Sequence, residues 1–238
     1  MSEAGPSAWT SGRRPGLLGQ ALMLYAVDVA PEDTARFAVW YVHEHLPERV
    51  AVPGFLRGRR YVRIDGPGQQ HLTLYDARDT AVFSSPEYLA RLDDPTPLTR
   101  EVVRTFRRPH RAVLSVLFSH GATTGRRLAM LQLPAADPAQ LHRWVEDDLA
   151  PTVLTHPDVY GLHLAVVDAG ATAAKSATAE GRDAAEEVDE ACVLLVDGTD
   201  VVGEAARRAA ARCAELGFTE APPDATVYEL VVTLLPTG

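Results

Sequence analysis

Side chains that could move a proton or stabilise an oxyanion gather between residues 40 and 75 of this 238-residue chain. Imidazole changes its charge near neutral pH, and guanidinium and phenol groups can stabilise negative charge that develops on a carbonyl oxygen. The sequence therefore predicts acid–base chemistry on a small molecule. The candidate catalytic residues are His45, His71, Arg59, Tyr61 and Tyr75, and the candidate substrate-binding residues are Trp40, Tyr41, His43, Phe55 and Thr73.

Each candidate also has a purely structural interpretation. His45 could cap the end of its helix by bonding a free carbonyl group, instead of transferring a proton. Arg59 and Tyr61 could decorate a surface strand. Trp40 and Tyr41 could belong to the hydrophobic core, because large aromatic side chains dominate packing. Both interpretations stay open at this point.

The same residues do not predict a metal or a cofactor. His43 and His45 stand two positions apart, about 200° around a helix, so they should not bind one metal ion from an intact helix. The chain has no GxGxxG loop, no P-loop and no recognisable haem-ligand motif. We therefore expect no cofactor and no bound metal.

A helix and a strand are needed to position the first candidates. The apolar run 21–28 has the length of a strand, and Pro31 with the acids after it favours the start of a helix. Pro47 disfavours helical backbone in the residue before it, so the helix is predicted to end near His45. A histidine in a last helical turn feels the negative end of the helix dipole, which favours imidazolium.

Two alternating stretches, 55–64 and 70–77, are predicted strands that carry the other candidates. One face of the first presents Phe55, Arg57, Arg59, Tyr61 and Arg63, and one face of the second presents His71, Thr73 and Tyr75. Because both faces are polar and aromatic, we expect them to line one cavity.

The order of predicted elements then repeats. The first set comprises strands 21–28, 55–64, 70–77 and 112–118 with helices 31–45, 84–92 and 95–108; the second comprises strands 128–133, 160–168, 192–197 and 226–235 with helices 137–149 and 201–216. Each set has the β-α-β-β-α-β order of a split ferredoxin-like unit. The expected divisions are a flexible tail 1–18, a first unit 19–120, a linker 121–127, and a second unit 128–238 with an inserted mobile loop 169–190.

The two copies differ where the candidates lie. Aligning Trp40-Tyr41 with Arg143-Trp144 places Asp148 opposite His45, and the polar strand face becomes largely aliphatic in the second copy. We expect the first half to keep the site. The alternative is a second site in which Asp147 or Asp148 replaces the histidine as base.

Charge and composition limit the partners. The chain carries a net charge of −9, with +2 in residues 1–119 and −11 in the remainder, which argues against nucleic acid. No stretch approaches the roughly 20 apolar residues needed to span a bilayer. Cys192 and Cys213 are isolated and are interpreted as buried thiols. We expect a cytoplasmic protein that binds a small molecule, and a homodimer stays open.

Several motifs of the first half resemble a known group of proteins. They are Trp40-Tyr41, Glu44-His45-Leu46-Pro47-Glu48-Arg49, Val52-Pro53-Gly54-Phe55, Arg59-Arg60-Tyr61 and Pro95-Thr96-Pro97-Leu98-Thr99-Arg100. The chain resembles the dimeric α+β barrel superfamily, and its first half is similar to the EthD-like proteins. That resemblance implies an α+β fold in which two tandem ferredoxin-like units pack sheet to sheet within one chain.

The resemblance implies three functional classes. Our main hypothesis is a cofactor-independent lyase, isomerase or cyclase acting on a small carbonyl or aromatic metabolite. The alternatives are an oxygen- or haem-dependent monooxygenase-type oxidoreductase on the same fold, and a non-catalytic small-molecule-binding protein.

Overall fold

The computed structural model describes residues 16–121, 123–134, 137–173 and 191–237. The expected tail 1–18 and loop 169–190 therefore lie mostly outside the described residues. The described part forms two compact units. The N-terminal unit contains the described residues 18–115, 167–173 and 228–237, and the C-terminal unit contains the described residues 16–17, 116–121, 123–134, 137–166 and 191–227.

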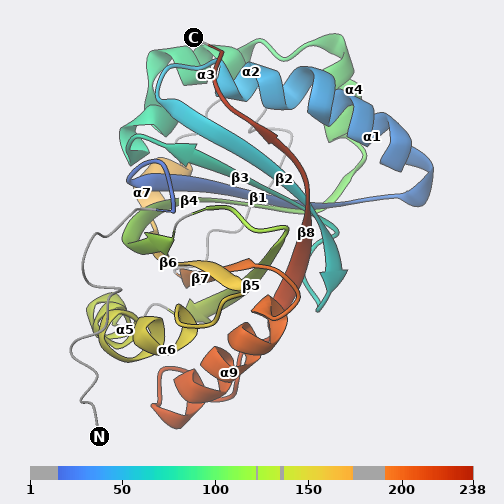
Figure 1. Ribbon diagram of the computed structural model, residues 1–238. Helices are drawn as coiled ribbons and strands as arrows, with labels where there is room; N and C mark the ends of the chain where they lie inside the picture. The colour runs from blue at the N-terminus through green and yellow to red at the C-terminus, as the bar shows by residue number, and fades with distance from the viewer. Residues whose placement is uncertain (1–15, 122, 135–136, 174–190, 238) are drawn as a thin grey trace, which may run out of the picture. The chain divides into compact units, whose positions relative to one another are not determined.

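An antiparallel sheet forms the base of the N-terminal unit (Figure 1). Its strands are β1 (Ala21–Val29), β2 (Phe55–Asp65), β3 (His71–Ala77) and β4 (Phe106–Gly121), and they follow the order β4-β1-β3-β2. The helical segments are the 3₁₀ turns η1 (Pro31–Asp33) and η3 (Thr80–Ser84), the π-helical turn η2 (Tyr41–His45), and α1 (Thr34–Trp40), α2 (Leu46–Val50), α3 (Pro86–Asp93) and α4 (Pro97–Val103).

The second copy repeats this order. Its strands are β5 (Arg127–Pro134), β6 (Val159–Val167), β7 (Ala191–Gly198) and β8 (Thr226–Leu234), and its helical segments are α5 (Pro138–Trp144), the π-helical turn η4 (Val145–Leu149), α6 (Ala150–Val153), α7 (Ala169–Ala173) and α9 (Val202–Glu215). The strand order β8-β5-β7-β6 matches β4-β1-β3-β2 position for position. The predicted fold class is confirmed: an α+β chain of two tandem ferredoxin-like units, as in the dimeric α+β barrels.

Helices cover one face of each sheet and build its core (Figure 1). In the N-terminal unit Phe37 and Trp40, one helical turn apart, pack on strand residues such as Met23 and Tyr75. Side chains that cap helix starts fix where these helices begin: Ser85 accepts from the N–H of Tyr88 at the start of α3. The core therefore lies between the helices and the strands that carry the candidate residues.

The helix through His45 does not end there, which corrects the prediction. Helical backbone continues from Thr34 to Val50 because the turn before Pro47 is widened: Leu46 N–H bonds the carbonyl of Tyr41, five residues back. In a π turn the missing proline N–H removes no i−4 bond that the helix needs. His45 is therefore buried in the middle of a helix, and the prediction that it stands at a helix terminus is wrong.

The second copy contains the same π turn, Val145–Leu149, ahead of Pro151. Matching the two turns pairs Trp40 with Trp144 and Glu44 with Asp148. The expected alignment is displaced by one residue, because Asp148 lies opposite Glu44 and not opposite His45.

A β-bulge in β2 corrects the expectation that Phe55 and Arg57 share one face of this strand. The register with β3 shifts between Phe55 and Arg57, so these two residues point to opposite faces of the sheet. Phe55 packs in the helix-covered core against Phe83 and Tyr88. The predicted single face of β2 is therefore split.

Cys192 and Cys213 are buried free thiols, as predicted. Burial raises the pKa of each thiol to about 11, so both stay protonated at neutral pH. In the part of the chain that the structure describes, no helix is both long enough and apolar enough to cross a membrane.

Candidate functional site

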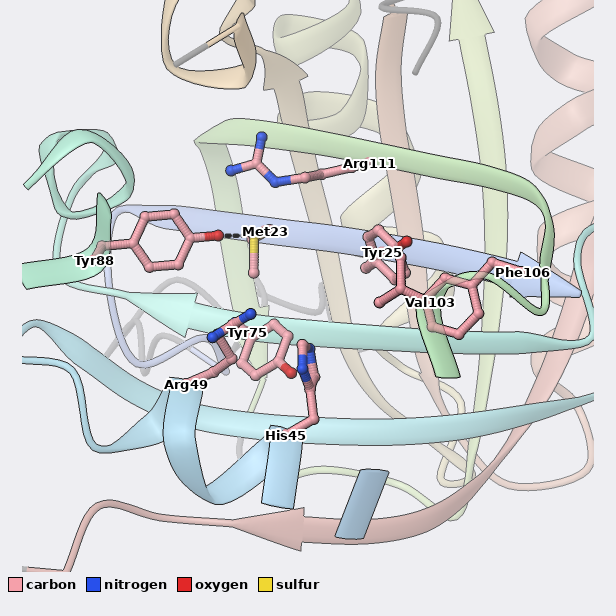
Figure 2. A pocket seen from close by; sticks show the side chains of 9 residues that line it. All are labelled: Met23, Tyr25, His45, Arg49, Tyr75, Tyr88, Val103, Phe106 and Arg111. Atoms are coloured by element: carbon pink, nitrogen blue, oxygen red, sulfur yellow. Dashed lines mark hydrogen bonds between the residues drawn. The ribbon is translucent and has the colours of Figure 1, made fainter. Parts of the chain in front are cut away.

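A small cavity lies between helix 34–50 and the sheet of the N-terminal unit (Figure 2). Its volume is about 20 Å³, enough for one water or one diatomic molecule. Its lining consists of Met23, Tyr25, His45, Arg49, Tyr75, Tyr88, Val103, Phe106 and Arg111. Val103 and Phe106 are only half-buried, so this side of the lining is the nearest to solvent.

The lining carries basic side chains and no carboxylate. His45 and Arg49 come from the helix, and Arg111 comes from β4 (Figure 2). Arg111 is 1% exposed; its Nη1 donates to the carbonyl of Thr172 at 2.8 Å, whereas its Nε and Nη2 find no hydrogen-bond partner among the described residues. Buried donors without partners are costly, so the cavity is suited to an anion or to an oxygen that accepts from Arg111.

Two phenol groups meet beside this charge. The hydroxyls of Tyr41 and Tyr75 are 3.5 Å apart, and Tyr75 lines the cavity. Burial raises the pKa of both phenols, so both are neutral hydrogen-bond donors at physiological pH. A third phenol, that of Tyr88, donates to the sulfur of Met23 at 3.4 Å.

Aromatic rings fix the orientation of the His45 imidazole. Its ring centroid lies 4.4 Å from that of Trp40 and 5.0 Å from that of Tyr41. Trp40 is itself held, because its Nε1 donates to Thr99 Oγ1 at 3.0 Å and Thr99 donates to Glu44 at 3.1 Å. His45 is thus presented to the cavity by a fixed aromatic support.

His71 and Thr73 lie on the same side of the sheet as Tyr75 but do not line the cavity. The His71 ring packs at 4.6 Å from Phe37, and its Nδ1 is 3.5 Å from Nη2 of Arg60. Burial, assisted by Arg60, lowers the pKa of His71 to about 4. His71 is therefore neutral at pH 7 and a weak base.

Arg59 and Tyr61 lie on the opposite face of the sheet from the cavity. Arg59 donates to Asp76 at 3.1 Å and to the hydroxyl of Tyr61 at 3.2 Å, and all three side chains are buried. His43 is exposed on the outer face of the helix. The structure therefore brings together His45 and Tyr75, backed by Trp40 and Tyr41, and separates them from Arg59, Tyr61 and His43.

Of the residues that line the cavity, only His45 and Tyr75 are sequence-based candidates, and its two arginines, Arg49 and Arg111, are absent from them. Arg49 lies four residues after His45, on the same face of a helix that is predicted to end before it. Arg111 directly precedes the predicted strand 112–118, although the Tyr25–Arg111 pairing places it inside the observed strand. The i, i+4 spacing of His45 and Arg49 was the available signal.

The whole chain is similar in fold to several solved structures, while no protein-family model and no curated protein matches it. An anthrone oxidase-like protein is 11% identical with a TM-score of 0.61, over 92% of this chain and 93% of that chain. A protein assigned as a monooxygenase from Fusobacterium nucleatum is 7% identical with a TM-score of 0.54 (93% and 97%), and one from Lactobacillus acidophilus is 10% identical with a TM-score of 0.52 (90% and 95%). The resemblance to the dimeric α+β barrels is confirmed at the level of fold.

The names of these proteins contradict the main functional hypothesis. They are an oxidase-like protein and proteins assigned as monooxygenases, not lyases, isomerases or cyclases. The expectation of lyase-type chemistry is therefore wrong on this comparison, and the oxidoreductase alternative is the better supported one.

The residues of the cavity do not fit haem, which that alternative included. A volume of about 20 Å³ cannot contain a porphyrin, and the ring of His45 is flanked by Trp40 and Tyr41. Among the residues that the structure describes, no three His, Cys, Asp or Glu side chains form a group that could hold a metal ion.

Proposed function

We propose that the N-terminal unit is an oxygen-dependent oxidoreductase of the monooxygenase type, acting on the anion of a small aromatic or carbonyl compound. The observation that carries the proposal is the buried basic cavity, in which Arg111 offers unused donors and Arg49 and His45 stand beside Tyr75. The oxidase and monooxygenase names of the similar structures agree with it.

The basic lining would favour the electron-rich form of the substrate. An enolate or phenolate is more stable next to guanidinium groups than in an apolar pocket, and it gives up electrons to dioxygen more readily than its neutral form. His45 carries the one imidazole among the lining residues, and imidazole is the usual general base of proteins, so His45 is the proposed base.

One reaction of this class balances without an external reductant. A ring CH₂ that is conjugated with a carbonyl through an aromatic ring loses a proton to His45, its carbanion adds dioxygen, and the peroxide loses water to leave a new carbonyl. The CH₂ group and one O₂ become C=O and H₂O, and the substrate supplies all four electrons. Arg49 and Arg111 would stabilise the enolate and then the peroxide anion.

The small volume of the cavity supports a role in binding dioxygen rather than the ring of the substrate. About 20 Å³ accommodates dioxygen but not a ring. The ring would enter where Val103 ends α4 and Phe106 begins β4, because these half-buried side chains separate the cavity from solvent.

Oxygen uptake with anthrone as the probe tests the proposal. We expect consumption above the protein-free rate, one ¹⁸O atom in the ketone formed under ¹⁸O₂, and a loss of about 100-fold or more in Arg111→Met and His45→Ala. Arg78→Met, at an exposed arginine just after β3 that lines neither the cavity nor the proposed entrance, is the matched control and should keep full activity. Uptake equal to the blank with anthrone and with simple hydroxylated anthrones, or equal rates in all variants, would refute it.

A further inference from the structure

The C-terminal unit contains a groove of about 590 Å³ between η4, α6 and α9. It is lined by Trp144, Asp148, Leu149, Thr152, Val153, His156, Val159, Val201, Glu204, Ala205, Arg208, Ala209 and Arg212. This volume lies in the range of small-molecule sites. We propose that the groove is a separate ligand site, selective for a protonated amine on an apolar, ring-sized body.

The groove exists because of a difference between the two copies. In the N-terminal unit the helix bearing Glu44 is tied to α4: Glu44 accepts from the hydroxyls of Thr96 and Thr99, and Trp40 donates to Thr99. In the C-terminal unit the matching residues are Asp148 and Trp144, and α9 presents alanines to the groove. The polar bridge between the helices is thus replaced by an open, apolar space.

Asp148 has a carboxylate, as Glu44 does, but in the described part of the chain it accepts no hydrogen bonds like those that Thr96 and Thr99 donate to Glu44. Among the described residues its carboxylate makes no ion pair and accepts no hydrogen bond, whereas Glu44 accepts two. The other charges of the rim are paired: Arg208 with Glu204 at 2.9 Å and Arg212 with Glu215 at 2.8 Å. The remaining charge at the groove is therefore negative, and an ammonium group would supply the donors that Thr96 and Thr99 supply to Glu44.

The floor of the groove favours an apolar body. Trp144, Leu149 and Val159 are core residues that keep 7–8% of their surface exposed. Trp144 is braced by Phe218, whose ring centroid is 5.6 Å away. A ring can stack on the indole while its ammonium group meets Asp148, which combines apolar burial with a charge-assisted hydrogen bond.

Three probes with the same naphthyl body separate the effect of ligand charge on affinity from the effect of apolar burial. They are 1-naphthylmethylamine, 1-naphthylmethanol and 1-naphthoate, and titration calorimetry measures the affinity of each. We expect the amine to bind most tightly and the carboxylate least. Asp148→Asn should weaken binding of the amine about tenfold and leave binding of the alcohol unchanged. Ala205→Phe, which fills the groove from α9, should weaken all three.

The matched control is Asp147→Asn, the same charge change one residue away and outside this groove. Melting curves of all variants show whether the fold is intact, and Asp148 is exposed, so its replacement should not disturb folding. Equal binding of amine and carboxylate would overturn the proposal. So would equal losses in Asp147→Asn and Asp148→Asn, which would indicate only the long-range field of an acidic surface. Binding to the groove is measured without turnover in the N-terminal cavity, so the two proposals fail separately.

Discussion

The guanidinium of Arg59 donates to the carboxylate of Asp76 at 3.1 Å, in a place where both side chains are at least 99% buried. Arg57 bonds the other oxygen of the same carboxylate, which also accepts from the N–H of Leu18. One acid thus accepts hydrogen bonds from two buried guanidinium groups and from a backbone amide. Its function is structural, and this changes what is expected of Arg59 variants.

Replacement of Asp76 by Asn should destabilise the protein strongly. It leaves two buried guanidinium groups without their carboxylate, and breaking a buried pair in this way costs about 3–5 kcal/mol. Urea unfolding followed by circular dichroism measures the change. Asp79→Asn breaks the exposed Arg78–Asp79 pair on the same segment and should leave the unfolding midpoint unchanged. Similar midpoints for the two variants would contradict the assignment.

His71 should make the protein less stable in mild acid. Its pKa is about 4 in the folded chain and about 6.5 when unfolded, so below pH 6.5 the unfolded state binds more protons. The contribution of neutral His71 is complete above pH 6.5 and is lost as the pH falls toward 4, with a total of about 3 kcal/mol.

Unfolding of the wild type and of His71→Leu at pH 7, 5.5 and 4.5 checks this. The variant should show a weaker decline of the unfolding free energy over that range, because leucine has no proton to bind. Parallel declines in the two proteins would mean that other groups dominate the acid response.

Gly58→Ala should be destabilising although the residue lies in a strand, where alanine is normally accepted. A Cβ at this position would stand 2.6 Å from Leu46 Cδ1 and 3.0 Å from Val50 Cγ2. Overpacking of this kind costs about 1–3 kcal/mol. Gly170→Ala, whose Cβ would meet only an ordinary contact at 3.5 Å, is the control and should unfold no more easily than the wild type, because alanine favours the helix α7 more than glycine does.

Thr99→Val should loosen the support of His45. The valine has nearly the same shape but cannot accept from Trp40 or donate to Glu44, and an unsatisfied buried polar group costs about 1–3 kcal/mol. We expect a lower melting temperature together with a change in tryptophan fluorescence. Thr155→Val, at an exposed threonine, should change neither property.

The repeat and the fold class were predictable because they depend on local patterns of polar and apolar residues along the sequence. The alternation of residues 71–77 and the recurrence of the same element order are set by burial on one face of a sheet. The predicted position of every strand is matched by an observed strand within a few residues, except that β4 begins earlier, at Phe106.

The site was only partly predictable, since it depends on departures from those patterns. Neither the bulge that turns Phe55 away from Arg57 nor the π turn that carries the helix past Pro47 leaves a mark in the periodicity. Arg49 was missed because the helix was predicted to end at His45, whereas the π turn continues it by the further turn that carries Arg49. The placement of Arg59 with Asp76 depended on a partner from another strand, which one sequence cannot identify.

The strand β8 has a consequence for how this protein is made. Its residues from Tyr228 onward belong to the N-terminal unit and stand next to β2 in the strand order, although they are synthesised long after β2. During translation the edge of β2 therefore remains open, with free N–H and C=O groups, until the ribosome releases this part of the chain. A nascent chain stalled before Thr226 should need a chaperone, and a synthetic peptide of residues 226–237 supplied in trans should rescue it.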